Sequence, residues 1–350
     1  ALMAGAATAQ QEPKLPASLS LTAYDTGSNG FNQAVAVGTM LKKRFGTDLR
    51  VLPAGSDVAR LAPLKAGRAQ ASAMGIGTFF AQEGVFEFAV REWGPQPLQL
   101  ILSSSSCNGQ SLGAAGDLGI KSAADLKGKR PRFVVGSPAV NQSMLALLAF
   151  GGWTAKDVKI VEFASYGAMM KGVSNNEIDL FFASTISGLS KEIESSPRGV
   201  TWVPMPASDK EGWARLQKVG PFFYPHKASC GAGIAKGQTV ETSVYPYPIF
   251  MAYGTQDAGL IHALTRAMLT HYDDYKDAVP GVDGLEGKRQ NLQWSMPYHA
   301  GAAKALAEAG LWTEAAQKHN QGLLRRQEVL AGAWSEFMKA SPPEDRDQFR

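Results

Sequence analysis

Strand-like and helix-like patterns of apolar residues alternate along the N-terminal part of the chain. Positions 19–27 alternate between apolar and polar residues as a half-buried strand does, whereas from Phe31 the apolar residues recur at helical spacing. Because parallel strands need crossover connections, this strand–helix–strand order predicts a parallel sheet. Strands are expected at 19–27, 48–55 and 70–76, and helices at 31–45 and from Ser56 to about Gly67.

The same alternation returns farther along the chain. Runs at 98–106 and 111–117 follow each other without a helix, and we interpret them as the edge of a first unit and a crossing strand. A second set comprises a short helix and a strand within 122–138, helices at 141–150 and 166–173, and strands at 158–164, 178–184 and 199–206. A loop rich in Pro and Tyr is expected at 220–248, then a strand at 249–254 and helices from Asp257, at 298–309 and at 313–339.

These patterns predict two α/β lobes, the second inserted into the first. Lobe I is expected at 18–116 plus 246–340 and lobe II at 117–245, with hinges near 116–121 and 245–250. Residues 1–17 are expected to be a signal-peptide remnant and disordered start, and 341–350 a frayed tail. Ligands of open α/β sheets bind beyond the carboxyl ends of the strands, so the ligand cleft is expected between the lobes.

Composition narrows the class of protein. Of the 350 residues 45% are apolar, enough for a sizeable core, and the net charge is only +4. The longest basic run is Lys42-Lys43-Arg44, so no nucleic-acid-binding surface is expected. No run of about 18 uncharged apolar residues occurs, so the protein is not expected to be membrane-embedded.

The first residues favour export. They are small and apolar and include Ala7-Thr8-Ala9, an A-x-A pattern typical of secretory cleavage sites, although a plain Ala-rich terminus would look the same. A periplasmic location is therefore expected. In that compartment Cys107 and Cys230 can form a disulfide but need not.

Signatures of catalysis and metal binding are scarce. The sequence contains no G-x-S-x-G, C-x-x-C, H-E-x-x-H or P-loop pattern. His262 and His271 fall on opposite faces of one predicted helix and cannot bind the same metal ion. Cys230 lies near His226, but no acidic partner for a nucleophile is evident. We expect no catalytic residue, no metal and no other cofactor.

Two loops rich in small polar residues stand at matching helix starts, at 26–32 and 136–143. Unpaired N–H groups and the helix dipole favour carboxylate or phosphate at such turns, although ordinary capping gives the same pattern. Arg60 could hold a carboxylate or cover a solvated helix face. Tyr166 and Tyr224 could line a cleft or pack in the core.

The strand at 178–184 ends in a cluster of hydroxyl groups, as expected of a strand end that lines a cleft. The candidate ligand-binding residues are Thr26, Gly27, Ser28, Asn29, Gly30, Asn32, Ser56, Arg60, Asn141, Gln142, Ser143, Tyr166, Ser184, Thr185 and Tyr224.

Four segments carry a resemblance to a known family: "DLGIKSAADLKGKRPRFVVGSP", "GAMMKGVSNNEIDLFFAS", "VYPYPIFMAYGTQDAGLIHALTRAML" and "SMPYHAGAAKALAEAGLW". Over residues 18–335 the chain resembles the TAXI (TRAP-associated extracytoplasmic immunogenic) solute-binding subunits of TRAP transporters. The resemblance implies a type II periplasmic-binding-protein fold without catalysis or a bound metal. It also implies capture of a small anionic metabolite, such as a carboxylate, for the membrane subunits of a TRAP permease.

The family's site positions correspond to 26–32, 56–60, Gln142 with its neighbours, and 184–185. The chain departs from the family in two places. Gln33 and Ala34 replace two tyrosines, and residues 139–142 replace a Gly-Ser-Gly-Thr turn. These departures imply that amide groups bind a different or less charged solute.

Two other functional classes remain open. An exported enzyme on the same scaffold would need an acid or base in the cleft, where Asp25 and Asp57 are the carboxylates of the predicted loops. An exported sensor or adaptor would present its closed form to a signalling partner. Turnover of a carboxylate substrate would favour the enzyme, whereas tight binding without turnover would favour the receptor.

Overall fold

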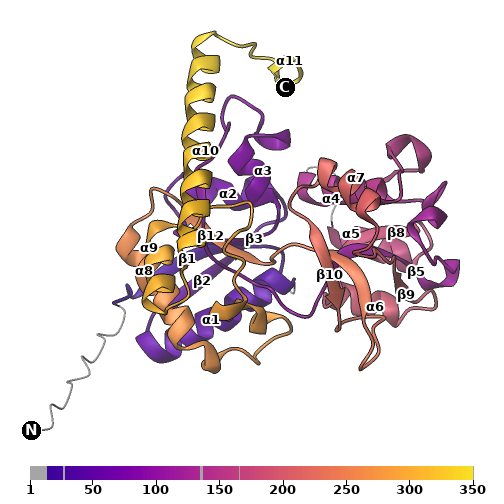
Figure 1. Cartoon of the computed structure of the whole chain (residues 1–350), viewed down its shortest axis with the longest axis horizontal. Coiled ribbons are helices and arrows are strands. Elements are labelled where there is room, and N and C mark those ends of the chain that lie inside the picture. The colour runs from indigo at the N-terminus through magenta and orange to yellow at the C-terminus, as the bar shows by residue number, and fades with distance from the viewer. Residues whose placement is uncertain (1–13, 27, 135–136, 165, 350) are drawn as a thin grey trace, which may run out of the picture.

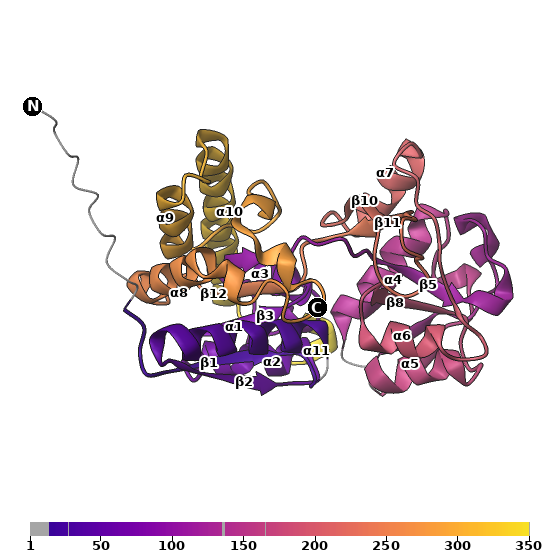
Figure 2. The same cartoon turned by 90° about the horizontal axis from the view of Figure 1, so that it is seen from below.

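The computed structural model describes residues 14–349 except 27, 135–136 and 165, and it does not describe the side chains of 346 and 347. The A-x-A pattern at 7–9, and with it most of the expected signal-peptide remnant, lies outside the described residues. The fold is mixed α/β with two lobes, which lie side by side in Figures 1 and 2.

Lobe I is built on a sheet with the strand order β2-β1-β3-β12-β4. Its strands are β1 (Ser18–Ala23), β2 (Asp48–Pro53), β3 (Ala71–Met74), β4 (Leu98–Ser103) and β12 (Ile249–Tyr253). As predicted, β1 pairs in parallel with both β2 and β3. In contrast β12, which returns from the far end of the sequence, is antiparallel to both of its neighbours.

The helices of lobe I include three that follow strands of this sheet and three from the C-terminal part of the chain. They are α1 (Asn29–Phe45), α2 (Asp57–Lys65), α3 (Gly77–Glu83), α8 (Ala258–Thr270), α9 (Ala300–Glu308) and α10 (Glu314–Lys339). Serine hydroxyls cap the first two: Ser28 accepts from Phe31 N at 3.2 Å, and Ser56 accepts from Ala59 N at 3.2 Å. Figure 1 shows α10 extending away from the body of the lobe.

Lobe II holds a sheet with the order β8-β5-β9, the parallel pair β6–β7 and the antiparallel hairpin β10–β11. The strands are β5 (Gln110–Ala115), β6 (Arg132–Val134), β7 (Val161–Phe163), β8 (Leu180–Ser184), β9 (Val200–Trp202), β10 (Tyr224–Ala228) and β11 (Val240–Val244). The helices are α4 (Pro138–Phe150), α5 (Tyr166–Ser174), α6 (Gly188–Glu194) and α7 (Lys210–Val219).

The structure differs from the predicted elements in three places. Lobe II starts earlier than expected, because β5 pairs with β8 from Gln110↔Ser184 onward and so belongs to the second lobe. The expected loop at 220–248 contains the hairpin β10–β11, whose short strands flank a long connection that hides the pattern. The expected frayed tail includes α11 (Arg346–Phe349), held because Phe349 packs 5.7 Å from Trp334.

Two segments connect the lobes, at 104–109 and around 245–248, as Figure 2 shows. Cys107 in the first segment forms a disulfide with Cys230, which follows β10, and their Cα atoms are 5.6 Å apart. The sequence left this pairing open. The disulfide joins the entry to lobe II to the loop between its last two strands, so it closes a ring around most of that lobe.

Candidate functional site

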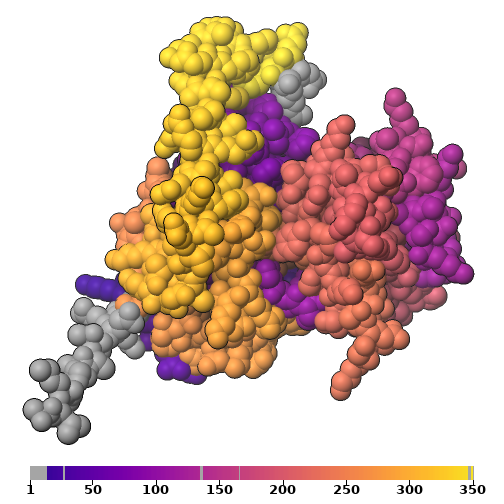
Figure 3. Space-filling model, in the orientation of Figure 1, coloured from indigo at the N-terminus to yellow at the C-terminus, as the bar shows by residue number. Residues whose placement is uncertain are grey.

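The lobes are in contact in this structure, and Figure 3 shows them touching over much of one face. Part of the contact is aromatic: Phe222 of lobe II packs against Phe79 and Phe80 of α3, with ring centroids 5.9 and 5.7 Å apart. Elsewhere a Cβ at Gly281 of lobe I would lie 2.5 Å from Ile186 Cδ1 of lobe II. The remaining part of the contact is polar, and it forms the candidate site.

The lobe I side of the site is centred on Arg60, which is buried. Its Nη2 forms an ion pair with Asp57 Oδ1 at 2.5 Å, and its Nη1 donates to Ala54 O at 2.7 Å. The guanidinium carbon lies 3.7 Å from the centre of the Tyr24 ring, a cation–π contact. Arg60 is therefore neither a solvated helix-face residue nor a free fork for a ligand, because both of its terminal nitrogens already bond groups of lobe I, while its Nε has no partner within the described residues.

Asp57 links the two lobes. Its side chain is 1% exposed, and its Oδ2 accepts a hydrogen bond from the backbone N of Ala139 at 3.4 Å. Ala139 lies in the first turn of α4, where unpaired N–H groups and the helix dipole favour an anion. The carboxylate also packs closely on α3, since a Cβ at Gly77 would lie 2.5 Å from Asp57 Cγ. A lobe I carboxylate thus lies at the N-terminus of a lobe II helix.

Tyrosines from the second connecting segment complete the lobe I side. The Tyr247 ring packs 5.8 Å from Tyr24 and 6.2 Å from Tyr245. Burial raises the pKa of Tyr24 to about 12 and the pKa values of the other two phenols well above their usual range, so all three are neutral hydroxyls at pH 7. Gly30 packs tightly here, because a Cβ would lie 3.2 Å from the Tyr247 hydroxyl oxygen and would require the ring to shift.

Tyr166 and Arg132 form the lobe II side. The Tyr166 hydroxyl is 3.4 Å from Phe182 O, and burial raises its pKa while the nearby charge of Arg132 opposes that rise. Tyr24 of lobe I also acts on the Tyr166 hydroxyl, so this group lies within electrostatic reach of both lobes. Arg132 itself is buried in β6, and among the described residues none of its guanidinium nitrogens has a hydrogen-bond partner.

Several predicted site residues form hydrogen bonds to other residues of the protein instead of facing a ligand. Both ends of the Asn141 amide bond the backbone of Val134, at 2.8 and 3.0 Å. The Ser184 hydroxyl accepts from Asn108 at 3.1 Å, and the Thr185 hydroxyl donates to Cys230 O at 2.8 Å. The hydroxyls that end β8 therefore hold the connection between the lobes.

Tyr224 is half-buried near Ser105 and Asn291, and burial raises its pKa. It therefore lies beside the connecting segments, among residues that hold the lobes together. Together with Asn141, Ser184 and Thr185, it is left out of the site that we propose.

The other predicted residues lie around the interlobe contact, and only some of them are able to bind a ligand. Ser28 and Ser56 are helix caps, Thr26 is exposed, Asn32 is half-buried, and Gly27 lies outside the described residues. Three side chains keep hydrogen-bonding capacity. Asn29 Nδ2 and Ser143 Oγ are buried without a partner among the described residues, and the half-buried Gln142 amide also makes no hydrogen bond within that part of the chain.

The candidate residues predicted from the sequence do not include Tyr24, Tyr245, Tyr247 and Arg132, and Asp57 appears there only as a carboxylate of a predicted loop. The Tyr-Pro-Tyr-Pro sequence at 245–248 was a usable signal, because two tyrosines in a segment between lobes are well placed to reach the cleft. Arg132 had no such signal, since it belongs to the basic run "GKRPR" and reads as part of a turn.

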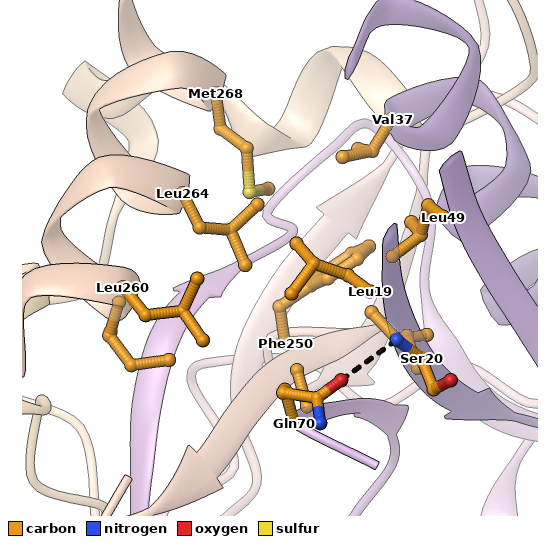
Figure 4. Close-up of a pocket in the computed structure, with 12 residues that line it drawn as sticks. Leu19, Ser20, Val37, Leu49, Gln70, Phe250, Leu260, Leu264 and Met268 are labelled. Atoms are coloured by element: carbon orange, nitrogen blue, oxygen red, sulfur yellow. Dashed lines mark hydrogen bonds between the residues drawn. The ribbon is translucent and has the colours of Figure 1, made fainter. Parts of the chain in front are cut away.

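An apolar gap in lobe I is not a ligand site. It lies between the sheet and α8, among Leu19, Val37, Phe250, Leu264 and Met268, beside the Ser20 N to Gln70 Oε1 hydrogen bond of 2.9 Å (Figure 4). Its volume of about 10 Å³ is no more than one water molecule needs.

Within the described residues, no group of three His, Cys, Asp or Glu side chains could hold a metal ion. No helix in the same part of the chain is long and apolar enough to cross a bilayer.

The family of the protein is identified from its sequence. The model of the NMT1-like family matches residues 25–310, more than half of the chain. The protein belongs to the NMT1-like family. The matched range of this NMT1-like protein includes lobe II, both connecting segments and lobe I apart from β1 and α10. No curated protein shows a significant match to the sequence.

Solved structures that resemble this NMT1-like protein do so distantly. A protein from Bordetella bronchiseptica RB50 is 16% identical, with 88% of this chain and 98% of that chain covered and a TM-score of 0.49. The alkanesulfonate-binding protein from Xanthomonas axonopodis pv. citri, bound to MOPS, is 14% identical over 92% and 93%, with a TM-score of 0.43. A periplasmic binding protein of an ABC transporter from Brucella ovis, with glutathione bound, is 11% identical over 73% and 69%, with a TM-score of 0.47.

Proposed function

We propose that this NMT1-like protein is an extracytoplasmic solute receptor that captures a small metabolite between its two lobes and delivers it to a membrane permease. One observation carries the proposal: the interlobe contact buries a cluster of charged and polar groups. Asp57 and Arg60 of lobe I meet the start of α4 of lobe II there. Buried polar groups without partners are rare in proteins, and several lie at this contact.

The proposed mechanism is closure. The lobes separate about the segments at 104–109 and 245–248, a solute enters, and the lobes close on it. Closure is favoured only to the extent that the closed state makes contacts with the solute that the open state lacks. A micromolar affinity corresponds to about 8 kcal/mol, which a few charge-assisted hydrogen bonds and burial can supply after ordering costs.

We propose that the solute is anionic, of the carboxylate or amino-acid-like class. The starts of α1 and α4 face the lobe contact, and their unpaired N–H groups favour negative charge. The proposed ligand-binding residues are Asn29, Gly30, Gln142, Ser143, Tyr166 and, added from the structure, Tyr24 and Tyr247. A TRAP-type permease as recipient and a periplasmic location are further proposals, and they rest on the resemblance to TAXI subunits and on the A-x-A pattern.

The proposal excludes catalysis. The carboxylate that faces the contact, Asp57, is held by Arg60 at 2.5 Å and by the start of α4, so it is not free to accept a proton from a substrate.

A thermal-shift screen tests the function. Wild-type protein is heated with dicarboxylates, amino acids, oxo-acids and their neutral analogues. A solute that binds the folded protein stabilises it by about 2.7 kcal/mol at a concentration of 100 times the Kd, and the Tm rises accordingly. We expect stabilisation without turnover by one chemical class, and Gln142→Ala should weaken it about tenfold while leaving the Tm of the solute-free protein unchanged. Chemical conversion of the stabilising solute would show an enzyme instead.

A further inference from the structure

Arg132 is the most unusual charged side chain of the molecule. It is completely buried in β6, and within the described residues its Nε, Nη1 and Nη2 make no hydrogen bond and no ion pair. Taking a cation out of water costs several kcal/mol unless a counter-charge and hydrogen bonds replace the lost hydration. A fold that retains such a group either tolerates a large defect or uses the group for something else.

Other buried arginines of this protein have ion-pair and hydrogen-bond partners, although Arg60 Nε has none within the described residues. Arg198, also in lobe II, is 8% exposed and bonds Asp117 at 3.0 and 3.1 Å, Val173 O at 3.0 Å and Ile178 O at 2.7 Å. Arg60 bonds Asp57 and Ala54 O. The packing therefore provides partners for a buried guanidinium at these two positions but not at Arg132.

The surroundings of Arg132 are aromatic. Its guanidinium carbon lies 5.6 Å from the centre of the Phe163 ring, and Tyr166 is the charged or polar group that acts on it most. Burial lowers the pKa of the guanidinium to about 9, so it remains a cation at neutral pH. Aromatic faces stabilise a cation weakly and leave its N–H donors unused.

Arg132 is close to the proposed solute site. It lies on β6, and the segment after β6 leads to the start of α4, which faces Asp57 of lobe I. The charge of Arg132 lowers the pKa of the Tyr166 hydroxyl, and Tyr24 raises it, so both groups are near this hydroxyl. The hydrogen bond that holds this hydroxyl on Phe182 O is long, at 3.4 Å, and therefore weak.

We propose that Arg132 is the receptor of the solute's acidic group: the anion displaces the Tyr166 hydroxyl and forms a bidentate pair with the guanidinium. This rests on the proposed function. Asp57 and Arg60 neutralise each other in lobe I, so among the described residues Arg132 is a positive charge without a counter-charge and can pair with one anionic group. The planar fork accepts a carboxylate or a sulfonate, and the ring of Phe163 forms a wall beside it.

The first test compares stability without any solute. Arg132→Met keeps the length of the side chain and removes the unpaired charge, so its Tm should rise by about 2 °C or more. Arg198→Met is the matched control and should lower the Tm, because it removes the donor to the buried carbonyls of Val173 and Ile178 and one of the partners of Asp179. A fall in Tm for Arg132→Met as large as that for Arg198→Met would make Arg132 structural and overturn the proposal.

The second test measures binding by titration calorimetry with named probes: succinate against succinamide, and methanesulfonate against dimethyl sulfone. Arg132→Met should weaken binding of the anion at least about tenfold, and Arg132→Lys, which keeps the charge but not the fork, should weaken it less. Neither variant should change binding of a neutral probe. The pair of acids shows whether the fork prefers a carboxylate or a sulfonate.

The outcomes separate this inference from the proposed function. Anion binding that is equal in wild type and Arg132→Met overturns the role of Arg132 and leaves the receptor intact. Binding of neutral probes alone overturns the acidic group. Failure of every probe to bind counts against the receptor itself, and the stability comparison of Arg132→Met with Arg198→Met then decides the role of Arg132 by itself.

Discussion

The imidazole of His299 caps α9 from a buried position. The side chain is 1% exposed, and its Nδ1 accepts a hydrogen bond from Gly301 N at 3.1 Å, which requires an unprotonated Nδ1. Burial lowers the pKa of His299, and also that of the partly buried His226. Single residues of this kind connect the stability of the fold to pH.

Stability should therefore fall as the medium becomes acidic. The folded pKa of His299 lies below its unfolded value of about 6.5, so below that pH the unfolded chain takes up a proton that the folded protein resists. The stabilisation is complete above about pH 6.5 and is lost as pH falls toward the folded pKa. Because Asn also caps helices, His299→Asn should keep the cap and flatten the Tm profile between about pH 7.5 and about pH 5. An equally steep profile in the variant would contradict this assignment.

The Asp57–Arg60 pair gives a second prediction at this scale. Both side chains are nearly inaccessible, at 1% and 3% exposed, so removal of one leaves the other as a buried unpaired charge. Arg60→Met should lower the free energy of unfolding by about 3–5 kcal/mol, measured by urea denaturation.

A double variant is the control for that measurement. Asp57→Asn with Arg60→Met removes both charges at similar volume, and it should recover most of the lost stability. A double variant as unstable as Arg60→Met alone would show that packing on Tyr24, and not the charge pair, stabilises this corner of lobe I.

At the scale of elements, the apolar pattern predicted most of the fold. The run at 180–183 reads as a buried strand, and β8 is buried along its whole length. The helical spacing after Phe31 predicted α1, but not which side faces inward: Val35 is 42% exposed whereas Gln33 is fully buried. The reason is that Gln33 lies beside Gly281, close to Ile186 of lobe II: a Cβ at Gly281 would be 3.0 Å from Gln33 Nε2.

The candidate site was harder to predict, because its residues differ from ordinary ones by their neighbours and not by their type. Arg130 and Arg132 stand two positions apart in one basic run. Arg130 lies partly in solvent and bonds Asp179 at 2.7 Å, whereas Arg132 is buried without a partner among the described residues. Likewise the hydroxyls of Ser184 and Thr185 were expected to face a ligand, but the pairing of β5 with β8 brings them to the connecting segment.

The disulfide allows a prediction about the stability of lobe II. The Cys107–Cys230 bond spans 123 residues of sequence, which make up most of lobe II. In the loop-entropy model a cross-link over a ring of this size contributes about 4–5 kcal/mol by restricting the unfolded chain. We expect Cys107→Ser with Cys230→Ser to lower the Tm in calorimetry and to split the transition, with lobe II melting first. A single unchanged transition would show that the bond adds nothing to lobe II.

At the scale of the whole molecule, the contact between the lobes involves charge as well as packing. The carboxylate of Asp57 accepts from Ala139 N at the start of α4, so part of the closed state depends on one charge placed at a helix N-terminus. Such an interaction contributes about 1–2 kcal/mol in a partly buried setting, enough to shift a two-state equilibrium between open and closed forms about fivefold or more.

The double variant Asp57→Asn with Arg60→Met tests this contribution, because it removes the charge without leaving an unpaired partner. We expect a larger radius of gyration than that of wild type in small-angle X-ray scattering without solute, and a return to the wild-type value at saturating solute. Affinity should fall by the factor by which the closed population falls, since only the closed form makes all contacts with the solute. A rise in affinity would have the opposite meaning: the solute would bind at the start of α4 in place of the Asp57 carboxylate, and closure would then depend on displacing that group and not on keeping it.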